Sequence, residues 1–357
     1  MITRLIELAV GNRVYVLLAT LLLTVVGGLA AAHLPIDAVP DITSPQVQIN
    51  TSVPALAPEE VEKQVTLPIE SNMAGLPGMV ELRSLSRFGL SQVTMTFEDH
   101  ADIYRLRQLV SERLQGVLTD LPAGVDVHLA PISTGLSEIF YYSVRYRANA
   151  PAKPTTEFDR LLALSTIQEY LIKPILRATP GLAEVNTSGG YEKQLVVIPH
   201  PAKLDNAGIT IDELAERLRE NAENAGGGFV EIGGEQIIIR AATRVQSRED
   251  ILALPLKFGA AVEALTVGDV AEVSIGSSFR SGASTEQGEE AVVGAAIMLL
   301  GENTRTVAEA VRTRLAEIQN KLPEGVEIVS LYDRGDLVAS TIHTVEKNLF
   351  EGAVLVA

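Results

Sequence analysis

The sequence has 357 residues, more than one ordinary hydrophobic core accommodates, so we expect two or three compact units. Hydrophobic residues make up 46% and charged residues 21%, which excludes a disordered chain and favours a soluble body with attached membrane segments. The net charge of -16 argues against a nucleic-acid partner and suits a cationic substrate, although acidity also serves solubility alone. Because the sequence contains no Cys, disulfides and thiolate metal sites are excluded.

The chain from Val14 to Leu34 contains no Asp, Glu, Lys or Arg and is long enough to cross a hydrocarbon core of about 30 Å as a helix. Arg4 and Arg13 precede this segment, and acidic residues follow it, so the positive-inside rule predicts a cytoplasmic N-terminus. A cleavable signal peptide ending at Ala30–Ala32 is the alternative, but such a peptide has an apolar run of only about 7–15 residues. A second apolar stretch begins at Leu349, and we expect the chain to stop within a second membrane helix.

Between residues 46 and 129 the hydrophobic pattern predicts the order strand, helix, strand, strand, helix, strand. Alternating residues mark the strands, and the second helix, capped by Asp102, has apolar residues near a 3.6 period. The expected elements are strand Gln46–Val53, helix Pro58–Ala74, strands Val80–Ser86 and Leu90–Phe97, a helix after Asp102, and strand Val125–Leu129. This is the order of a split βαβ unit, an α+β fold of the ferredoxin-like type.

A weak internal repeat predicts a second copy of this unit. Pro77–Glu81 resembles Pro180–Glu184, and Leu121–Asp126 resembles Leu322–Glu327, but the second pair lies nearly twice as far apart as the first. A long insertion in the second copy, roughly residues 189–283, explains both spacings; chance similarity of Pro-Gly turns is the alternative. The expected elements are strand Ile139–Tyr146, helix Phe158–Ala178, strand Glu184–Ser188, and, after the insertion, strand Ala291–Leu299, helix Thr306–Gln319 and strand Val326–Leu331.

The insertion carries its own structural signals. Thr210 and Glu213 have the spacing of a capping box, which predicts the start of a helix. Gly233 and Gly234 lie between two apolar segments, 229–232 and 236–239, a pattern typical of a tight β-hairpin. We therefore expect the insertion to form a small α+β subdomain.

The sequence contains no catalytic motif, no nucleophile elbow and no His/Cys cluster, and Gly226–Gly228 lacks the Lys-Ser/Thr of a phosphate-binding loop. We predict no enzymatic activity and no cofactor. In Glu98–Asp102 a His stands among three acids, a pattern that suits a divalent cation but favours a helix start more. Asp126 and His128 share one strand face as two potential ligands, with a solvated face as the favoured alternative.

Glu138 is the preferred candidate ligand for a metal ion. It lies in Ser133–Phe140, which we expect to be a flexible segment where the first unit passes into the second, and clefts commonly form at such junctions. Its carboxylate suits zinc, cobalt or cadmium ions, and no Met near it in the sequence offers the thioether that a monovalent copper ion prefers. An ordinary surface carboxylate is the alternative.

Six segments of the sequence carry a resemblance to a known family: Leu34–Ile42, Pro58–Glu70, Arg83–Gly89, Gly189–Gln194, Gly301–Asn303 and Tyr332–Arg334. They resemble the heavy-metal efflux branch of the resistance-nodulation-division superfamily, and the cobalt-zinc-cadmium type in particular, from Met1 to Ala357. The resemblance implies a proton-driven exporter of divalent heavy-metal cations. It also implies a homotrimer in the bacterial inner membrane, with the bulk of the chain in the periplasm, that works in a tripartite assembly with a periplasmic adaptor and an outer-membrane channel.

The resemblance assigns a role to each expected unit. The cytoplasmic N-terminus and the first transmembrane helix are expected at residues 1–34, and porter subdomain PN1 at 35–132. Porter subdomain PN2 is expected in two halves, 133–188 and 284–333, with docking subdomain DN between them at 189–283. Residues 334–357 are expected to form a connection and the truncated start of a second transmembrane helix. The hairpin at Gly233 and Gly234 is expected to dock onto a neighbouring protomer. The family's proton-relay carboxylates lie beyond this length, so we do not expect the chain alone to transport.

Two other interpretations remain at this point. The chain could belong to a multidrug exporter of the same superfamily, but aromatic residues are only 4% and Trp is absent, which is poor material for a drug pocket. It could also be a two-helix membrane sensor with an extracytoplasmic binding domain. The coding sequence that follows this chain distinguishes the last case, because a pump continues into a membrane-rich half and a sensor into a signalling domain.

Overall fold

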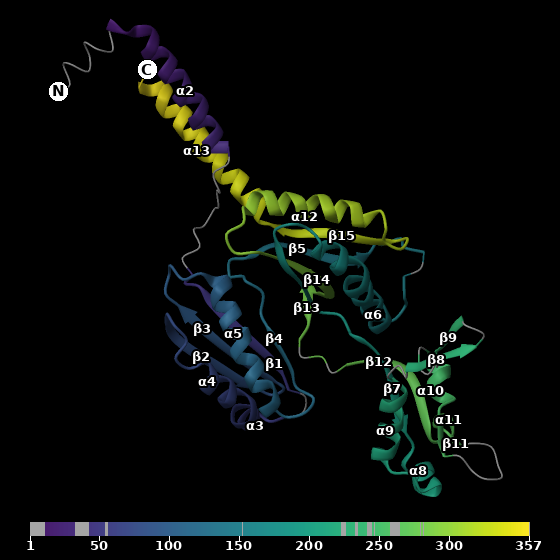
Figure 1. Ribbon diagram of the computed structural model, residues 1–357. Coiled ribbons are helices and arrows are strands. Elements are labelled where there is room, and N and C mark those ends of the chain that lie inside the picture. Colours follow the sequence, from purple (N-terminus) through teal and green to yellow (C-terminus); the bar gives the residue numbers. More distant parts are fainter. Residues whose placement is uncertain are drawn as a thin grey trace. The chain divides into compact units, whose positions relative to one another are not determined.

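The computed structural model describes residues 11–32, 43–53, 56–151, 153–222, 226–232, 235–240, 245, 247–257, 265–278, 280 and 282–356. Two compact units are present: the first consists of Met1–Arg147, Leu171–Thr187 and Val293–Ala357, and the second of Ala148–Tyr170 and Ser188–Val292. The chain therefore leaves the first unit and returns to it twice (Figure 1).

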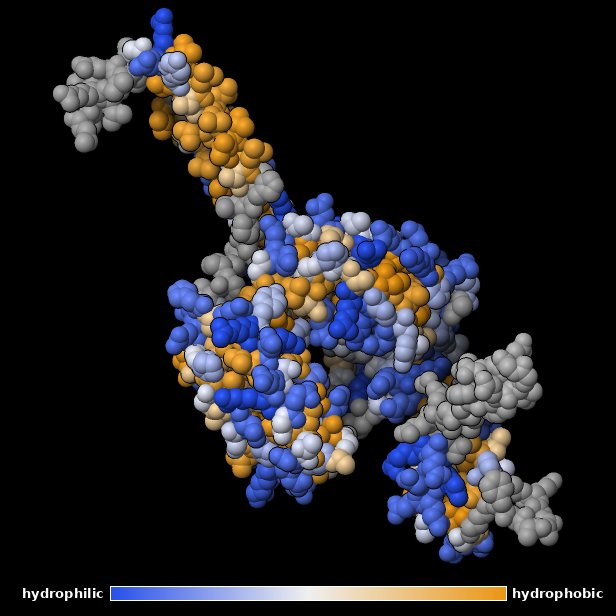
Figure 2. Space-filling view, in the orientation of Figure 1, coloured by the Kyte–Doolittle hydropathy of each residue, from blue (hydrophilic) through white to orange (hydrophobic). Residues whose placement is uncertain are grey.

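Helix α2 (Arg13–Ala32) contains residues 14–32 of the apolar segment that we predict to cross a membrane. Its side chains from Val14 to Leu29 are exposed, and its visible surface is hydrophobic (Figure 2). The hydroxyls of Thr20 and Thr24 donate to carbonyls one turn earlier at 2.8 Å, which satisfies both polar groups within the helix. Among the described residues, α2 is the one helix long and apolar enough to span a bilayer.

The first sheet consists of β1 (Gln46–Ser52), β2 (Met79–Arg87), β3 (Leu90–Phe97) and β4 (Asp126–Leu129). Neighbouring strands are antiparallel, in the order β2-β3-β1-β4. The helical segments α3 (Pro58–Val61), η1 (Glu62–Thr66, π-helical) and α4 (Leu67–Met73) follow β1, and α5 (Ile103–Val117) with the 3-10 turn η2 (Leu118–Asp120) follows β3. The predicted order of elements is confirmed.

Local sequence signals explain where these elements begin and end. The Asp102 carboxylate accepts hydrogen bonds from the backbone N–H groups of Tyr104 and Arg105, at 3.0 and 3.3 Å, and so caps α5 as predicted. Gly89 adopts a φ of 73°, which lets a two-residue turn join β2 to β3. One face of the sheet and the inner faces of the helices share a core that includes Val47, Ile49, Val93, Met95, Phe97, Val65, Ile69, Val110 and Leu114.

The second sheet repeats the arrangement of the first. It consists of β5 (Glu138–Tyr146), β6 (Leu182–Ser188), β14 (Glu289–Met298) and β15 (Val326–Asp333), with the short β13 (Ser284–Glu286) paired to the start of β14. The order β6-β14-β5-β15 corresponds strand for strand to β2-β3-β1-β4. The internal repeat predicted from two short resemblances is thereby confirmed.

Helices occupy the positions that the repeat requires. The segments α6 (Glu157–Ile167), η3 (Gln168–Ile172, π-helical) and α7 (Lys173–Arg177) follow β5, and α12 (Thr304–Gln319) follows β14. Asn303, the last residue of the Gly301–Asn303 motif, caps α12 by accepting from the N–H groups of Arg305 and Thr306 at 3.1 and 3.3 Å.

Helix α13 runs from Arg334 to Val356. We predicted a connection from residue 334 and a helix within the apolar stretch from Leu349, and the structure shows that the connecting residues are themselves helical and continuous with that stretch. The hydroxyls of Ser340, Thr341 and Thr344 each donate at 2.9 Å to a carbonyl one turn earlier. The polar half of the segment therefore continues the helix and satisfies its own side chains.

The insertion forms a small α+β assembly, as predicted. Its elements are β7 (Lys193–Pro199), α8 (Pro201–Ala207), α9 (Ile211–Ala222), β8 (Gly226–Ile232), β9 (Glu235–Arg240), α10 (Arg248–Leu252), β10 (Pro255–Lys257), β11 (Leu265–Thr266), α11 (Val267–Val270) and β12 (Ala271–Ser277). Antiparallel pairs join β7 to β12, β8 to β9 and β10 to β11. The capping box before α9 is confirmed, because Glu213 N–H donates to the Thr210 hydroxyl at 3.2 Å and Thr210 N–H to the Glu213 carboxylate at 2.8 Å.

Two glycines attach the insertion to the strand before it. Gly189 and Gly190 have φ angles of 78° and 74°. A Cβ on Gly189 would lie 2.2 Å from the carbonyl oxygen of Ala291, and a Cβ on Gly190 would lie 2.7 Å from Cβ of Ser165. Glycine is required at this junction because another residue would meet both an unfavourable φ and a neighbouring chain segment.

Candidate functional site

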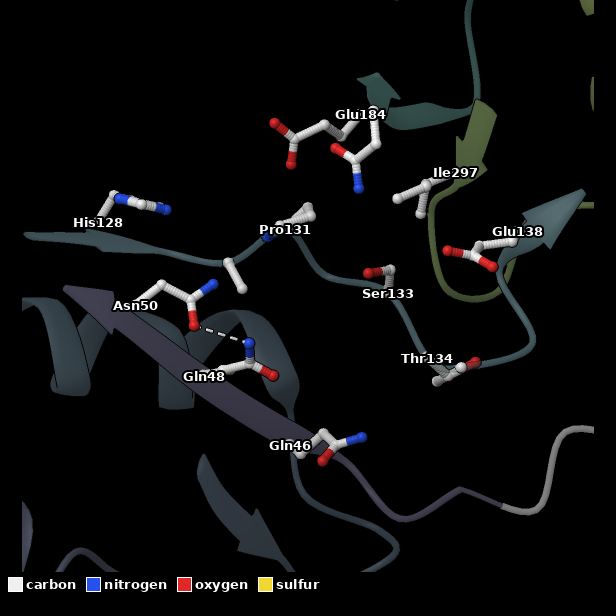
Figure 3. A pocket seen from close by; sticks show the side chains of 13 residues that line it. Gln46, Gln48, Asn50, His128, Pro131, Ser133, Thr134, Glu138, Glu184 and Ile297 are labelled. Carbon is white, nitrogen blue, oxygen red and sulfur yellow. Dashed lines mark hydrogen bonds between the residues drawn. The ribbon is translucent and has the colours of Figure 1, made fainter. Parts of the chain in front are cut away.

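A cavity of about 480 Å³ lies in the first unit, at the face of the first sheet opposite its helices (Figure 3). Strands β1, β4, β5, β6 and β14 and the connection between β4 and β5 contribute its walls. The polar side chains that line it are Gln46, Gln48, Asn50, His128, Ser133, Thr134, Glu138, Glu184 and Asn186. None of the described residues in this lining is Phe, Tyr or Trp.

The alternation of β1 places carboxamides in this cavity. Val47, Ile49 and Thr51 are buried on the core side of the strand, so Gln46, Gln48 and Asn50 occupy its other face. The Gln48 amide donates to Oδ1 of Asn50 at 2.8 Å, the dashed line in Figure 3. Gln92 of the neighbouring strand β3 donates to the same oxygen at 3.3 Å. This strand face is therefore a hydrogen-bonded polar surface.

Glu138, our candidate metal ligand, is the first residue of β5 and lines the cavity. Its exposed carboxylate accepts a hydrogen bond on Oε2 from the Tyr141 hydroxyl. Burial, and next the hydrogen bond to Glu138, raise the pKa of Tyr141 to about 12, so the hydroxyl keeps its proton at neutral pH. The Tyr141 ring meets the Tyr332 ring edge to face, with 5.9 Å between centroids. The ligand candidate is thus held from one side by an aromatic pair.

The segment before Glu138 was predicted to be flexible, and the structure instead shows a hydrogen-bonded loop. Ser137 N–H donates to the Thr134 carbonyl at 3.0 Å, and Thr134 N–H donates to the Ser137 hydroxyl at 2.9 Å. Met298 N–H of β14 donates to the Ser137 carbonyl at 2.8 Å. Because Thr134 and Ser137 are buried, these bonds are protected from water, and the backbone that leads to Glu138 is well defined.

Three side chains of the kinds that bind divalent cations share the cavity: Glu138, Glu184 and His128. They come from three different strands (Figure 3). Within the described part of the chain, however, no three His, Cys, Asp or Glu side chains lie close enough to hold a metal ion together. The cavity therefore offers carboxylate and imidazole donors singly, without a closed coordination site.

Three other predictions concern the pair Asp126 and His128, the segment Glu98–Asp102, and the hairpin at Gly233 and Gly234. Asp126 and His128 are both exposed on β4, as their spacing indicates, but only His128 lines the cavity. In Glu98–Asp102 the helix start is confirmed: Asp102 caps α5, and Asp99 accepts from the Ser44 hydroxyl at 2.7 Å. Gly233 and Gly234 lie outside the described residues, although the strands on either side pair from Ile232 opposite Glu235.

Sequence reasoning did not identify Glu184 or the β1 carboxamides as part of the site. Glu184 entered only as the end of a repeated motif and the start of a predicted strand, and the alternating Gln46, Gln48 and Asn50 were used only to predict a strand. The polar alternate positions of β1 were a usable signal, because one face of an antiparallel sheet is often left open beside its core.

The chain matches the AcrB/AcrD/AcrF family over residues 5–357. Over its whole length it is 47% identical to Protein HelA of Legionella pneumophila and 45% identical to the cobalt-zinc-cadmium resistance protein CzcA of Cupriavidus metallidurans, of which it covers 34% and 33%. A crystal structure of a heavy metal efflux pump matches with a TM-score of 0.84 at 31% identity, over 98% of this chain and 34% of that chain. The chain thus spans about a third of the length of these relatives. It belongs to the AcrB/AcrD/AcrF family of the resistance-nodulation-division superfamily, in the heavy-metal efflux branch that its motifs indicate.

Proposed function

We propose that this chain forms the N-terminal part of a proton-driven transporter that exports divalent heavy-metal cations of the cobalt, zinc and cadmium class. The observation that carries the proposal is that Glu138, Glu184 and His128 line one polar cavity in a chain of this family. Carboxylate and imidazole are donors that these ions accept. The metals in the name of CzcA support the same class.

The cavity favours metal cargo over an organic drug or a monovalent copper ion. Its described lining has no Phe, Tyr or Trp side chain to provide a large apolar surface for an organic molecule. Met298 is close in space, because its N–H pairs with Ser137, but its side chain is buried and Ile297 is the β14 residue that lines the cavity. The cavity therefore lacks the thioether ligand that a monovalent copper ion prefers.

Glu138 is the proposed ligand for the ion in transit. An exporter must release its cargo, so donors supplied singly by different strands suit transport better than a closed four-ligand site. In this proposal, residues outside this chain complete the coordination when the cavity closes. The metal ion is the transported substrate, and the proposal includes no cofactor and no enzymatic step.

The proposed assembly is a homotrimer in the bacterial inner membrane that works with a periplasmic adaptor and an outer-membrane channel. The N-terminus is cytoplasmic and α2 crosses the membrane. In this proposal, PN1 consists of residues 35–132, and PN2 consists of residues 133–188 together with 284–333. DN consists of residues 189–283, and residues 334–357 lead into a second membrane helix. The β8–β9 hairpin, with Gly233 and Gly234 at its tip, docks onto a neighbouring protomer.

The test is metal resistance of cells that carry the complete transporter with Glu138→Gln. Glutamine keeps the size and the hydrogen bonding of the side chain but removes its charge, so we expect lower tolerance of zinc, cobalt and cadmium. Glu309→Gln, at an exposed position of α12, is the matched control and should leave tolerance unchanged. Unchanged tolerance in the Glu138→Gln cells, at equal expression, would eliminate the proposed role.

A further inference from the structure

The turn where β15 becomes α13 is fixed to its surroundings by every residue of the motif Tyr332–Arg334. The Asp333 carboxylate, 5% exposed, accepts from Nε and Nη2 of Arg312 on α12, with 3.0 Å from Nε. The other oxygen of Asp333 accepts from Gly335 N–H at 2.8 Å, which closes the first turn of α13. Arg312 also donates to Asp336 at 2.7 Å. The start of α13 is therefore attached to α12 by charge-assisted hydrogen bonds.

Arg334 is buried, with 4% of its surface exposed, and its guanidinium donates to the carbonyl of Leu136. A buried cation is costly unless hydrogen bonds satisfy it, and the Leu136 carbonyl supplies such a bond to Arg334. Leu136 belongs to the hydrogen-bonded loop that lines the cavity, two residues before Glu138. Arg334 thus fixes the backbone from which the candidate ligand extends.

A second connection from the same turn reaches Glu138 from the other side. Tyr332 packs edge to face on Tyr141, whose hydroxyl donates to Oε2 of Glu138. Tyr141 does not line the cavity itself, so it orients the carboxylate from behind. With Oε2 engaged by Tyr141, Oε1 is the oxygen left for a cation.

We propose that Arg334 is a positioning residue for the Glu138 carboxylate, acting through the Leu136 carbonyl, and that Tyr332 and Tyr141 hold the same carboxylate through its Oε2. The proposal rests on the proposed function, because it assumes that Glu138 binds the transported ion. As a consequence, the N-terminal end of α13 and the metal ligand are linked through these side-chain contacts. A displacement of α13 would change the orientation of Glu138.

The test uses the complete transporter, purified in detergent, with Co²⁺ as the probe. Binding is measured by titration calorimetry, and the visible spectrum of bound Co²⁺ reports its coordination geometry. We expect Arg334→Gln and Tyr141→Phe each to raise the dissociation constant by about 10-fold or more, the usual cost of removing a partner of a metal ligand, and to alter the spectrum. Arg334→Lys, which retains one donor and the charge, should recover part of the affinity.

Matched controls are Arg314→Gln, in an ion pair with Glu317 on α12, and Tyr146→Phe, farther along β5; both should bind Co²⁺ like the wild type. In a Glu138→Gln background, Arg334→Gln and Tyr141→Phe should cause no additional loss, because they act through that carboxylate. If Arg334→Gln does not fold, Arg334→Lys and Tyr141→Phe are compared with the wild type in its place.

Unchanged affinity and spectrum in the folded Arg334 and Tyr141 variants would overturn the positioning role. The role would also be overturned if these substitutions reduced Co²⁺ affinity as much in the Glu138→Gln background as in the wild type, because that result would indicate a general structural effect. A different outcome addresses the proposed function itself. If Glu138→Gln alone leaves Co²⁺ binding unchanged, Glu138 is not a ligand, whatever the other variants do.

Discussion

Arg280 holds Glu290 through two hydrogen bonds, of 2.6 and 3.0 Å between the terminal guanidinium nitrogens and the two carboxylate oxygens. The same guanidinium lies over the Tyr191 ring, 4.5 Å from its centroid, and that ring packs against Phe158 at 4.8 Å. This cluster connects the segment that leaves the insertion, the Gly189–Tyr191 segment that enters it, and β14.

Replacing Arg280 with lysine should loosen this junction. Lysine keeps the positive charge but cannot form the two-pronged contact with Glu290, and it stacks less well on Tyr191. We expect faster thermolysin cleavage of the chain between Ser277 and Gly288. Arg83→Lys is the control, because its ion pair with Glu81 is exposed on β2. Equal cleavage rates in the wild type and the Arg280→Lys variant would contradict the assigned role.

The same ion pair should make stability depend on pH. The hydrogen bond from Arg280, with its charge as a further contribution, lowers the pKa of Glu290 below its ordinary value of 4.5, although burial opposes the shift. Because the pKa is lower in the folded state, the ion pair stabilises the protein at pH values above the ordinary pKa. This contribution disappears as the pH falls through the lowered pKa. Melting temperatures of the wild type and Glu290→Gln should therefore differ near neutral pH and converge in acid. Glu289→Gln, at the exposed neighbouring position, should show no such convergence.

Gly189→Ala should destabilise the protein by about 2–5 kcal/mol. The substitution combines the cost of a left-handed φ, about 1–2 kcal/mol, with a clash against the Ala291 carbonyl 2.2 Å away, about 1–3 kcal/mol. Denaturant unfolding followed by circular dichroism measures the change. Gly282→Ala is the control, since no atom lies within 4 Å of the added Cβ, and it should change stability by less than about 0.5 kcal/mol. Equal effects of both substitutions would refute the packing argument.

The proposed docking role of the hairpin tip can be tested with a unique cysteine. This chain has no Cys, so once any cysteines in the rest of the complete transporter are replaced by serine, Gly233→Cys can carry a single photo-activated cross-linker. If the β8–β9 hairpin reaches a neighbouring protomer, irradiation should produce covalent dimers and trimers. The same label at Gly288, in the turn between β13 and β14, is the comparison. Only monomer from the Gly233 label would count against the docking role.

The apolar segment of α2 should remain attached to the mature protein. Its charge-free run from Val14 to Leu34 exceeds the apolar core of a signal peptide, and every described side chain from Val14 to Leu29 is exposed, as contact with lipid requires. N-terminal sequencing of protein purified from membranes should find a start before Val14, so that the apolar segment is retained. A start at His33 would show that the segment is a cleaved signal peptide.

Local patterns predicted most of the secondary structure, because helix and strand periodicities and caps depend on neighbours in sequence. The alternation of β3, the cap at Asp102 and the box at Thr210 all appear as expected. The repeat predicted that β5, β6, β14 and β15 form a second copy, since equal element order implies equal pairing. Local patterns did not predict that α13 is helical from Arg334 onwards, or that hydrogen bonds hold the loop before Glu138, which we expected to be flexible.

The sequence by itself determined the elements, the repeated topology and the candidate Glu138. Only the tertiary structure decided that Glu184, His128 and the β1 carboxamides share a cavity with Glu138, and that Arg334 supports the loop beside it. These residues are distant along the chain and meet because β4 lies next to β1 in one sheet, β6 and β5 both pair with β14 in the other, and strands of both sheets line the same cavity. Strand order and register place such side chains together, and neither is contained in the local periodicity of any single segment.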